Sequence, residues 1–491
     1  MNLRSLDRVL FAGRICASAL VVGGVWCAAS PALAQDAGKS PTLEELDRQI
    51  QILRQQVSDL KASQASKYAE AKNEPKLLLD NGRPTFKTSD GRFSASLRSI
   101  VQFDAGHYSQ EGAPPGSDLS SGTNFRRARF GVTGKIGKAF DYNFIYDFGG
   151  SGSEGATISS AYLQFNALAP FAFRVGAFAP AASLEDSAGA TDPLFLEKAS
   201  AVEITRGIAG GDGRSAFAAT AAGDRYFVSL AYTGGKVGQS GYFDEQQGVV
   251  GRVAGLAYQA EDVHVVVGAN GSYVFDTADA AAGPGAASTG VNFQNSPELR
   301  VDDTSATGGS VSLVSTGNIN AESARHWGVD AGAQWKGFYL EGGYYQFGAD
   351  RRGTGLSGSD PVFDGWYIAG SWILSGEGRQ YDAKSATFRA PKVTSPVTGL
   401  KDSGWGAWEL AVRYSAVDLN YHEALPTSAG GIRGGEQDIW TFGVNWYAND
   451  LVRISLNYLV IDIDRKSGAN APFTDIGQDI QAVGVRTQLA F

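Results

Sequence analysis

From Arg92 to the C-terminus, the chain alternates between apolar and polar residues with a period of two. Residues 140–148 place aromatic rings on one face and polar side chains on the other: Phe140, Tyr142, Phe144, Tyr146 and Phe148 oppose Asp141, Asn143 and Asp147. The same alternation recurs at 408–415, 440–446 and 483–491. This period predicts β-strands with one apolar and one polar face, which soluble sandwiches and membrane barrels both contain.

Three features favour a barrel. The strand-like runs reach the length needed to cross a bilayer at a tilt, about ten residues. Aromatic residues cluster at the strand ends, as in interfacial girdles. Tight connections alternate with long polar ones at 109–123, 276–325, 348–363 and 417–436, which places turns at one end and loops at the other. We therefore predict an all-β fold, a sixteen-stranded antiparallel transmembrane β-barrel with strands from 92–108 to 480–491.

The third long loop is assigned to about 179–212. Residues 201–209 could form another strand, but that strand would put long loops and tight turns at the same end. We therefore place 201–209 in the third loop, which is acidic. It carries Glu185, Asp186, Asp192, Glu197, Glu203 and Asp212 against Lys198 and Arg206. Sixteen strands would enclose a lumen too wide for the side chains of the wall to fill, so water is expected to occupy it unless a loop narrows it.

Two N-terminal segments lack the period of two. Residues 1–34 carry Arg4, Arg8 and Arg14, an apolar stretch and an Ala-x-Ala site, which predicts a secretory signal peptide. Residues 35–75 are predicted to form a coiled-coil helix followed by a periplasmic tether from Lys61 to Pro75. Apolar residues alternate there at spacings typical of a coiled-coil seam: Leu43, Leu46, Ile50, Leu53, Val57 and Leu60. The narrow stripe favours self-association over packing on the protein's own body. Residues 76–491 are assigned to the barrel.

Composition excludes several classes of function. The formal charge of −9 argues against a nucleic-acid partner, because phosphate binding requires a basic surface. Cys16 and Cys27, the only cysteines, lie in the predicted signal peptide, so thiol chemistry is not expected in the mature chain. The histidines show no metal-ligand spacing, and no nucleophile elbow or phosphate-cradling loop is found. We predict no enzyme activity, no catalytic residues, no cofactor and no metal site.

The charges are distributed unevenly along the strands. If aromatic and aliphatic residues face lipid, the inward cations include Arg98, Arg127, Arg129, Lys135, Arg174, Arg252, Lys336, Arg413, Arg453 and Arg486. The opposing inward acids are Asp104, Asp141, Asp147, Asp330, Glu341 and Glu409. This predicts a basic wall, which would raise the local concentration of anions without binding them tightly. The alternative is that each charge only hydrates the lumen or pairs with a neighbouring acid.

Two further segments have a distinctive charge. Residues 376–404, at the end with the tight turns, carry Arg379, Lys384, Arg389, Lys392 and Lys401. Together with basic residues before the first strand, they predict a basic periplasmic vestibule, although a flexible solvated linker is the alternative. The acidic loop 276–325 is expected to be a solvated surface.

Several stretches, taken together, resemble the phosphate-selective porin O and P family. They are 125–132, 141–148, 161–163, 173–176, 327–329, 365–367, 378–382, 404–415 and 445–447, and the run from Trp405 to Ser415 is the most specific. The resemblance spans about 90–491. It implies a trimer of outer-membrane barrels, an inward third loop, pore-lining arginines that pass anions, and lysines near the periplasmic mouth. The positions that match are Arg126, Arg127 and Arg129, followed by Arg174 and Arg413.

These observations predict an outer-membrane porin of a Gram-negative bacterium. It would give passive diffusion to small hydrophilic solutes and prefer anions such as phosphate. Expected partners are other copies of the chain in a homotrimer, outer-membrane lipids and small anions. One alternative is a weakly selective general porin. Another is an envelope-tethering structural barrel, for which residues 41–75 are the candidate contact with peptidoglycan or another periplasmic partner.

Overall fold

The computed structural model describes residues 42–73, 75–80, 82–150, 157–239, 241–283, 288–301, 311–352, 360–399 and 403–491. The chain divides into two units, Met1–Ala71 and Lys72–Phe491. The predicted signal peptide lies outside the described residues. In the part of the chain that is described, no helix is both long and apolar enough to span a membrane.

Helix α1 spans Leu43–Asn73. All six residues of the predicted apolar seam lie on it and are exposed in the single chain. The helix continues through 61–73, so the prediction of a tether beginning at Lys61 is corrected. Alanine, lysine and glutamate are frequent in this stretch and have high helix propensity, which explains the extension.

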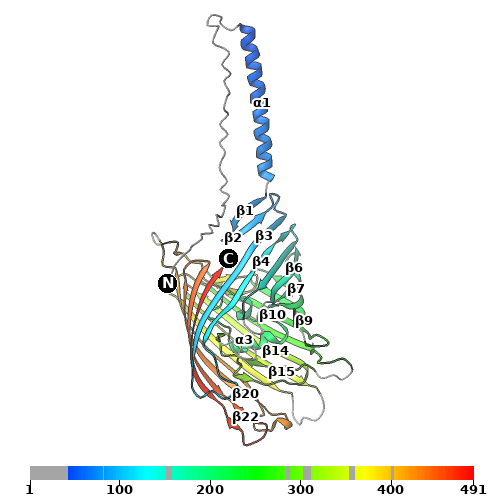
Figure 1. The fold of residues 1–491 in the computed structure, drawn as a ribbon, viewed down its shortest axis with the longest axis vertical. Coiled ribbons are helices and arrows are strands. Elements are labelled where there is room, and N and C mark those ends of the chain that lie inside the picture. The colour runs from blue at the N-terminus through cyan, green and yellow to red at the C-terminus, as the bar shows by residue number, and fades with distance from the viewer. Residues whose placement is uncertain are drawn as a thin grey trace, which may run out of the picture. The chain divides into compact units, whose positions relative to one another are not determined.

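Sixteen of the described strands form a closed antiparallel barrel, as predicted (Figure 1). The closure is made by β24 and β3, whose register pairs Val485 with Ala105. The strands are β3 (Phe93–Gln110), β4 (Gly122–Ile136), β5 (Phe140–Asp147), β6 (Thr157–Leu168), β7 (Phe171–Phe178), β8 (Arg214–Ala222), β9 (Tyr226–Lys236), β10 (Gln247–Ala260), β11 (Val263–Asp276), β14 (Ala321–Trp335), β15 (Phe338–Arg351), β16 (Val362–Ile373), β19 (Ala407–Tyr421), β20 (Ile432–Tyr447), β21 (Val452–Asp464) and β24 (Gln478–Ala490).

A hairpin that the sequence pattern did not predict precedes the barrel. Strands β1 (Lys76–Asp80) and β2 (Arg83–Lys87) pair with each other, and β2 extends the sheet by pairing with β3. The remaining short elements lie in connections: α2 (Leu184–Ser187), α3 (Ser200–Ala209), β12 (Gln294–Asn295), β13 (Val314–Ser315), β17 (Gln380–Asp382), β18 (Thr387–Arg389), η2 (Thr427–Ala429), β22 (Lys466–Ser467) and β23 (Thr474–Asp475).

The outer surface of the barrel is apolar, as the alternation requires. Large side chains such as Phe144, Leu230 and Trp372 are about half exposed on it. Rings on neighbouring strands stack there, with the Phe338 and Trp372 centroids 5.6 Å apart. An apolar band of this kind matches the hydrocarbon core of a bilayer.

Inside the barrel, nearer the long loops, apolar side chains of the wall and of a long connection pack into one buried cluster. Inward residues of β21, including Leu459, Ile461 and Ile463, are buried against Leu299 and Val301 of the connection between β11 and β14. The prediction that this connection is a solvated surface is therefore wrong for 293–301 and 313–314, which are mostly buried, whereas 281–283 and 317–318 are exposed. Its apolar residues cover inward aliphatic side chains that would otherwise face water. We call this region the apolar plug.

Candidate functional site

The third loop, residues 179–213, enters the lumen and carries α2 and α3. The Ser183 hydroxyl caps α2 by accepting a hydrogen bond from the Asp186 amide at 3.3 Å. Helix α3 buries Val202, Ile204 and Ile208, and it contacts strands from β10 to β19. Residues 201–209 are therefore helical and belong to the loop, where the sequence analysis placed them. The loop brings its carboxylates to the arginines of β4.

Arg126 and Arg129 are each held by carboxylates. Arg126 donates to both oxygens of Glu197, from Nε at 2.8 Å and from Nη2 at 3.2 Å. Arg129 donates to Asp147 at 2.6 Å and to Asp212 at 2.5 Å. These bidentate and bridging contacts fix the third loop to the wall and neutralise both guanidinium groups.

Arg127 has a different environment. Its Nη1 donates to the amide oxygen of Gln102 at 2.8 Å, and its buried Nε has no hydrogen-bond partner in the part of the chain that the structure describes. Gln102 is itself held by Gln488, to which it donates at 2.6 Å. Among the described residues, no carboxylate forms an ion pair with Arg127. Its positive charge is therefore less compensated than those of Arg126 and Arg129.

The acids of the third loop are also paired. Arg206 contacts Asp186 at 2.5 Å, Asp212 at 2.9 Å and Glu203 at 3.4 Å. Burial alone would raise the pKa of Glu203, but Arg206 and Arg300 outweigh it and lower this pKa to about 2. Burial is likewise outweighed at Glu197 and Asp212, whose pKa values are held well below their usual range by neighbouring arginines. The loop is thus acidic in composition but ion-paired in place.

These pKa values give an expected pH dependence. A carboxylate whose pKa is lowered in the folded protein contributes stability at pH values above its ordinary pKa, which is 4.5 for Glu203. This contribution is lost as the pH falls towards the pKa in the folded protein, about 2 for Glu203. We expect single-channel conductance and open-channel noise to stay constant between pH 7 and 5, and to change below about pH 4.5 as the third loop detaches. Recordings in planar bilayers at stepped pH would measure this. A transition completed between pH 7 and 5 would contradict it.

Arg413 lies in a buried cluster instead of on an open lumen wall. Its Nη1 donates to Glu185 at 3.2 Å and to the Glu197 carbonyl oxygen at 3.0 Å, and its Nη2 donates to Glu298. Glu298 also accepts from the Ser200 amide at 2.8 Å and from the Ser415 hydroxyl at 2.6 Å. This cluster joins the third loop, the β11–β14 connection and β19.

Burial also affects the acid on the other side of Arg413. It raises the pKa of Glu185 to about 8, although Arg413 opposes the shift. Arg413 thus has two carboxylate partners, Glu185 and Glu298. Of the predicted loop residues, Lys198 lies 3.5 Å from Asp186 and belongs to the ion-paired network around Arg206.

Arg98 and Arg174 lie nearer the end with the tight turns. The Arg174 guanidinium stacks 4.2 Å from the Tyr162 ring centroid and donates to Gln164 at 2.8 Å. Arg98 lines a cavity of about 670 Å³ together with Arg83, Arg389 and Lys392. Asp192 and Asp450 also line this cavity. We call it the turn-end cavity.

The predicted lysine cluster is not assembled as a unit. Lys392 lines the turn-end cavity, whereas Lys384 is exposed in the connection between β17 and β18. Lys401 lies outside the described residues. The basic residues that line the turn-end cavity are Arg83, Arg98, Arg389 and Lys392.

The connection between β16 and β19, which contains most of these residues, folds into the lumen. Arg252 donates to the carbonyl oxygens of Ser385 at 2.5 Å and of Ala386 at 3.1 Å. Arg379 forms an ion pair with Glu409 at 3.0 Å. The flexible-linker alternative is therefore not supported for this described segment, because these contacts hold it against the wall.

Sequence reasoning missed Gln102, Glu298 and Arg300 as members of the site. The inward parity of Gln102 on β3 could have identified it. Glu298 and Arg300 carried no such signal, because they lie in a long connection without a period. No group of three or more histidine, cysteine or acidic residues suited to hold a metal ion occurs among the described residues.

Comparisons with known proteins give the following similarities. The family model described as phosphate-selective porin O and P matches residues 95–491. Porin O of Pseudomonas aeruginosa is 24% identical over 394 residues, which cover 78% of this chain and 86% of that protein. An uncharacterised protein of Caulobacter vibrioides is 24% identical over 440 residues, covering 86% of this chain and 79% of that one.

Solved structures are similar at lower identity. OmpT, an outer membrane protein of Vibrio cholerae, has a TM-score of 0.48 and 11% identity, covering 82% of this chain and 98% of that one. An anion-selective porin from Comamonas acidovorans has a TM-score of 0.43 and 12% identity, covering 81% of this chain and 100% of that one.

Proposed function

The chain belongs to the phosphate-selective porin O and P family and is an outer-membrane porin, and we propose that it passes small anions by passive diffusion along the inner wall that carries Arg127. The observation that carries the proposal is that Arg127 of the inner wall has no carboxylate ion-pair partner among the described residues. The end of the barrel with the long loops is then extracellular, and the end with the tight turns is periplasmic.

The balance of charges around the third loop supports an anion preference. Among the described residues, the ion-paired network and Arg127 together contain seven cations and six carboxylates. The cations are Arg126, Arg127, Arg129, Lys198, Arg206, Arg300 and Arg486, and the carboxylates are Asp104, Asp147, Asp186, Glu197, Glu203 and Asp212. The surplus is one positive charge, although the loop alone is acidic.

The same pairing explains why an anion would pass instead of remaining bound. Guanidinium groups already held by carboxylates offer few free donors to a solute. A single uncompensated cation attracts an anion, and weak attraction allows it to leave as well as enter. The turn-end cavity, with Arg83, Arg98, Arg389 and Lys392, would then receive the ion on the periplasmic side.

Reversal potentials across planar bilayers under a KCl gradient test this function. We expect the sign of the potential to show that chloride is more permeant than potassium, because the constriction has a positive surplus. A cation preference would overturn the proposal. Addition of millimolar phosphate should reduce the chloride current. Chloride preference without this reduction would favour the weakly selective general porin.

We also propose that the protein assembles as a homotrimer. The exposed apolar seam of α1 supports self-association, because a coiled coil would cover it. On this proposal, residues 1–34 are removed on export, residues 35–75 act in the periplasm, and residues 76–491 form the channel. The envelope-tethering alternative assigns the same N-terminal segment to a contact with peptidoglycan.

A further inference from the structure

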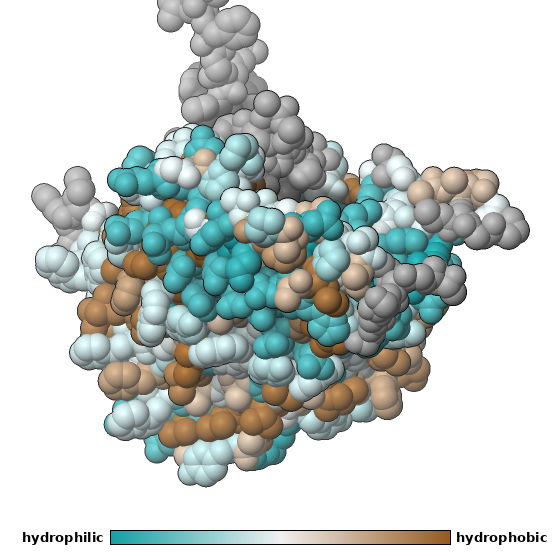
Figure 2. Space-filling view, turned by 90° about the horizontal axis from the view of Figure 1, so that it is seen from below, coloured by the Kyte–Doolittle hydropathy of each residue, from teal (hydrophilic) through white to brown (hydrophobic). Residues whose placement is uncertain are grey.

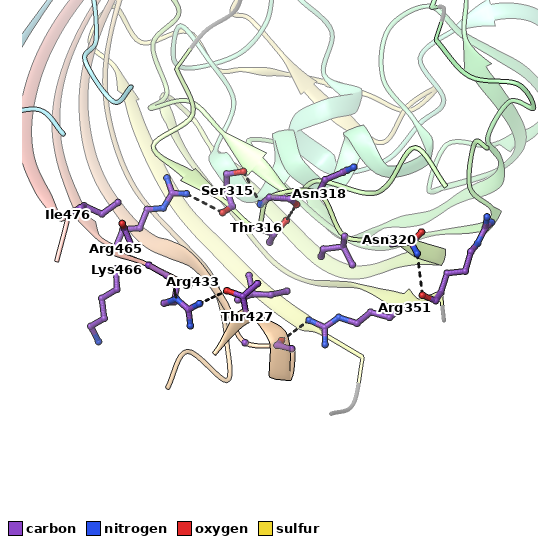
Figure 3. A pocket seen from close by; sticks show the side chains of 18 residues that line it. Ser315, Thr316, Asn318, Asn320, Arg351, Thr427, Arg433, Arg465, Lys466 and Ile476 are labelled. Atoms are coloured by element: carbon purple, nitrogen blue, oxygen red, sulfur yellow. Dashed lines mark hydrogen bonds between the residues drawn. The ribbon is translucent and has the colours of Figure 1, made fainter. Parts of the chain in front are cut away.

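A concave site other than the turn-end cavity lies at the extracellular mouth. It is a pocket of about 540 Å³ between the ends of β15 and β20 and the connections that carry β13, η2 and β22 (Figure 3). Viewed from that end, hydrophilic side chains gather across the face of the barrel (Figure 2). We call this site the mouth pocket.

The mouth pocket has an unbalanced charge. Arg351, Arg352, Arg433, Arg465 and Lys466 line it, and no aspartate or glutamate among the described residues does. Two of these cations are neutralised by acids outside the lining, since Arg352 pairs with Asp279 at 2.9 Å and Lys466 with Glu423 at 3.3 Å.

The other three guanidinium groups are fixed by neutral oxygen atoms. Arg351 donates to the Gly430 carbonyl oxygen at 2.7 Å, and Arg465 donates to the Leu313 carbonyl oxygen at 2.8 Å. Arg433 donates to the Leu425 carbonyl oxygen and to the Thr427 hydroxyl, both at 2.7 Å. Among the described residues, the buried Nη1 of Arg351 and the buried Nε of Arg465 have no hydrogen-bond partner. These hydrogen bonds hold each of the three guanidinium groups in place, and among the described residues no carboxylate neutralises their charges.

The floor of the mouth pocket belongs to the apolar plug. Ile319 and Ile432 line the pocket and are members of the buried cluster that also contains Leu313 and Ile463. Charged solutes do not cross such packed apolar side chains. The pocket is therefore suited to hold a charged solute.

From this geometry we propose that the mouth pocket binds a phosphorylated sugar. The three carboxylate-free guanidinium groups suit a phosphate, because the guanidinium fork matches its oxygen atoms. The rest of the lining is rich in hydroxyl and amide groups that suit sugar hydroxyls: Ser315, Thr316, Asn318, Asn320, Thr427 and Ser467. The volume lies within the range of small-molecule sites, roughly 300–1,000 Å³, and exceeds the needs of inorganic phosphate.

Arginine labelling tests the site on the unmodified full-length protein in detergent. Phenylglyoxal modifies free guanidinium groups, and peptide mass spectrometry identifies the modified positions. We expect glucose 6-phosphate to protect Arg351, Arg433 and Arg465, and glucose to protect none of them. Protection by inorganic phosphate at equal strength would overturn the assignment to a sugar. Absence of protection at all three would overturn the site.

Calorimetric titration of glucose 6-phosphate gives an independent measurement. The double substitution Arg351→Gln and Arg465→Gln should weaken binding at least tenfold and leave the conductance unchanged. Arg225→Gln is the matched control, because Arg225 also donates to a carbonyl oxygen, that of Leu256 at 2.9 Å, but lies in a periplasmic turn. Equal affinity of the wild type and a folded double variant would overturn the proposal.

A second ligand distinguishes the source of the sugar. A phosphorylated lipopolysaccharide core oligosaccharide carries the same chemistry on the cell surface. Saturable binding of glucose 6-phosphate assigns the pocket to free solutes, and binding of the oligosaccharide alone assigns it to the surface glycan. Binding of neither ligand would contradict the proposal.

Discussion

Arg413→Met is expected to destabilise the barrel by about 3–5 kcal/mol, because it leaves a buried carboxylate without its partner. The charge left behind is that of Glu298, which is 3% exposed. Methionine approximates the length of the arginine side chain, so most of the loss should be electrostatic. Denaturant titration in detergent, followed by tryptophan fluorescence, would measure the free energy of unfolding.

Two further variants make this prediction specific. Arg325→Met removes an ion pair with Asp350 that lies at the exposed rim, so its cost should stay below about 1 kcal/mol. Adding Glu298→Gln to Arg413→Met removes the uncompensated charge and should recover part of the loss. Equal stability of Arg413→Met and Arg325→Met would show that the cluster does not lock the loops together.

Arg127→Glu is expected to abolish or reverse the anion preference. The substitution changes the surplus beside the third loop from one positive to one negative charge. Two unit charges about 4 Å apart interact with about 1 kcal/mol in water and about 4 kcal/mol near a protein surface. A change of about 1.4 kcal/mol in the interaction energy with the passing ion, which lies in this range, would alter the permeability ratio of anion to cation about tenfold. Reversal potentials under a KCl gradient would measure this ratio for the wild type and the variant.

Neutral variants separate a local effect from a general loss of charge. Arg127→Gln should lower the anion preference by less than Arg127→Glu does. Arg325→Gln removes the same charge near the extracellular rim and should leave the reversal potential unchanged. If the two glutamine variants shift the potential equally, Arg127 has no special role in permeation.

The acidic composition of the third loop does not by itself predict the charge of the constriction. Six acids against two bases suggest a constriction that repels anions. In the structure, Asp212 is neutralised by Arg129 of the wall, and Glu203 by Arg206 and Arg300. The alternation turns both Arg127 and Arg129 inward, but only the contacts distinguish Arg129, which is ion-paired, from Arg127.

The sequence by itself determined the sixteen strands, their inward and outward faces, and the third loop as the long connection between β7 and β8. These features follow from an alternation of period two, which each strand carries in its own residues. The tertiary structure decided which connections enter the lumen and which charges pair. Arg413 and Glu298 are 115 positions apart, and the β11–β14 connection has no period that predicts its burial. Such contacts depend on the closure of the barrel, which brings distant segments together only after every strand has found its neighbour.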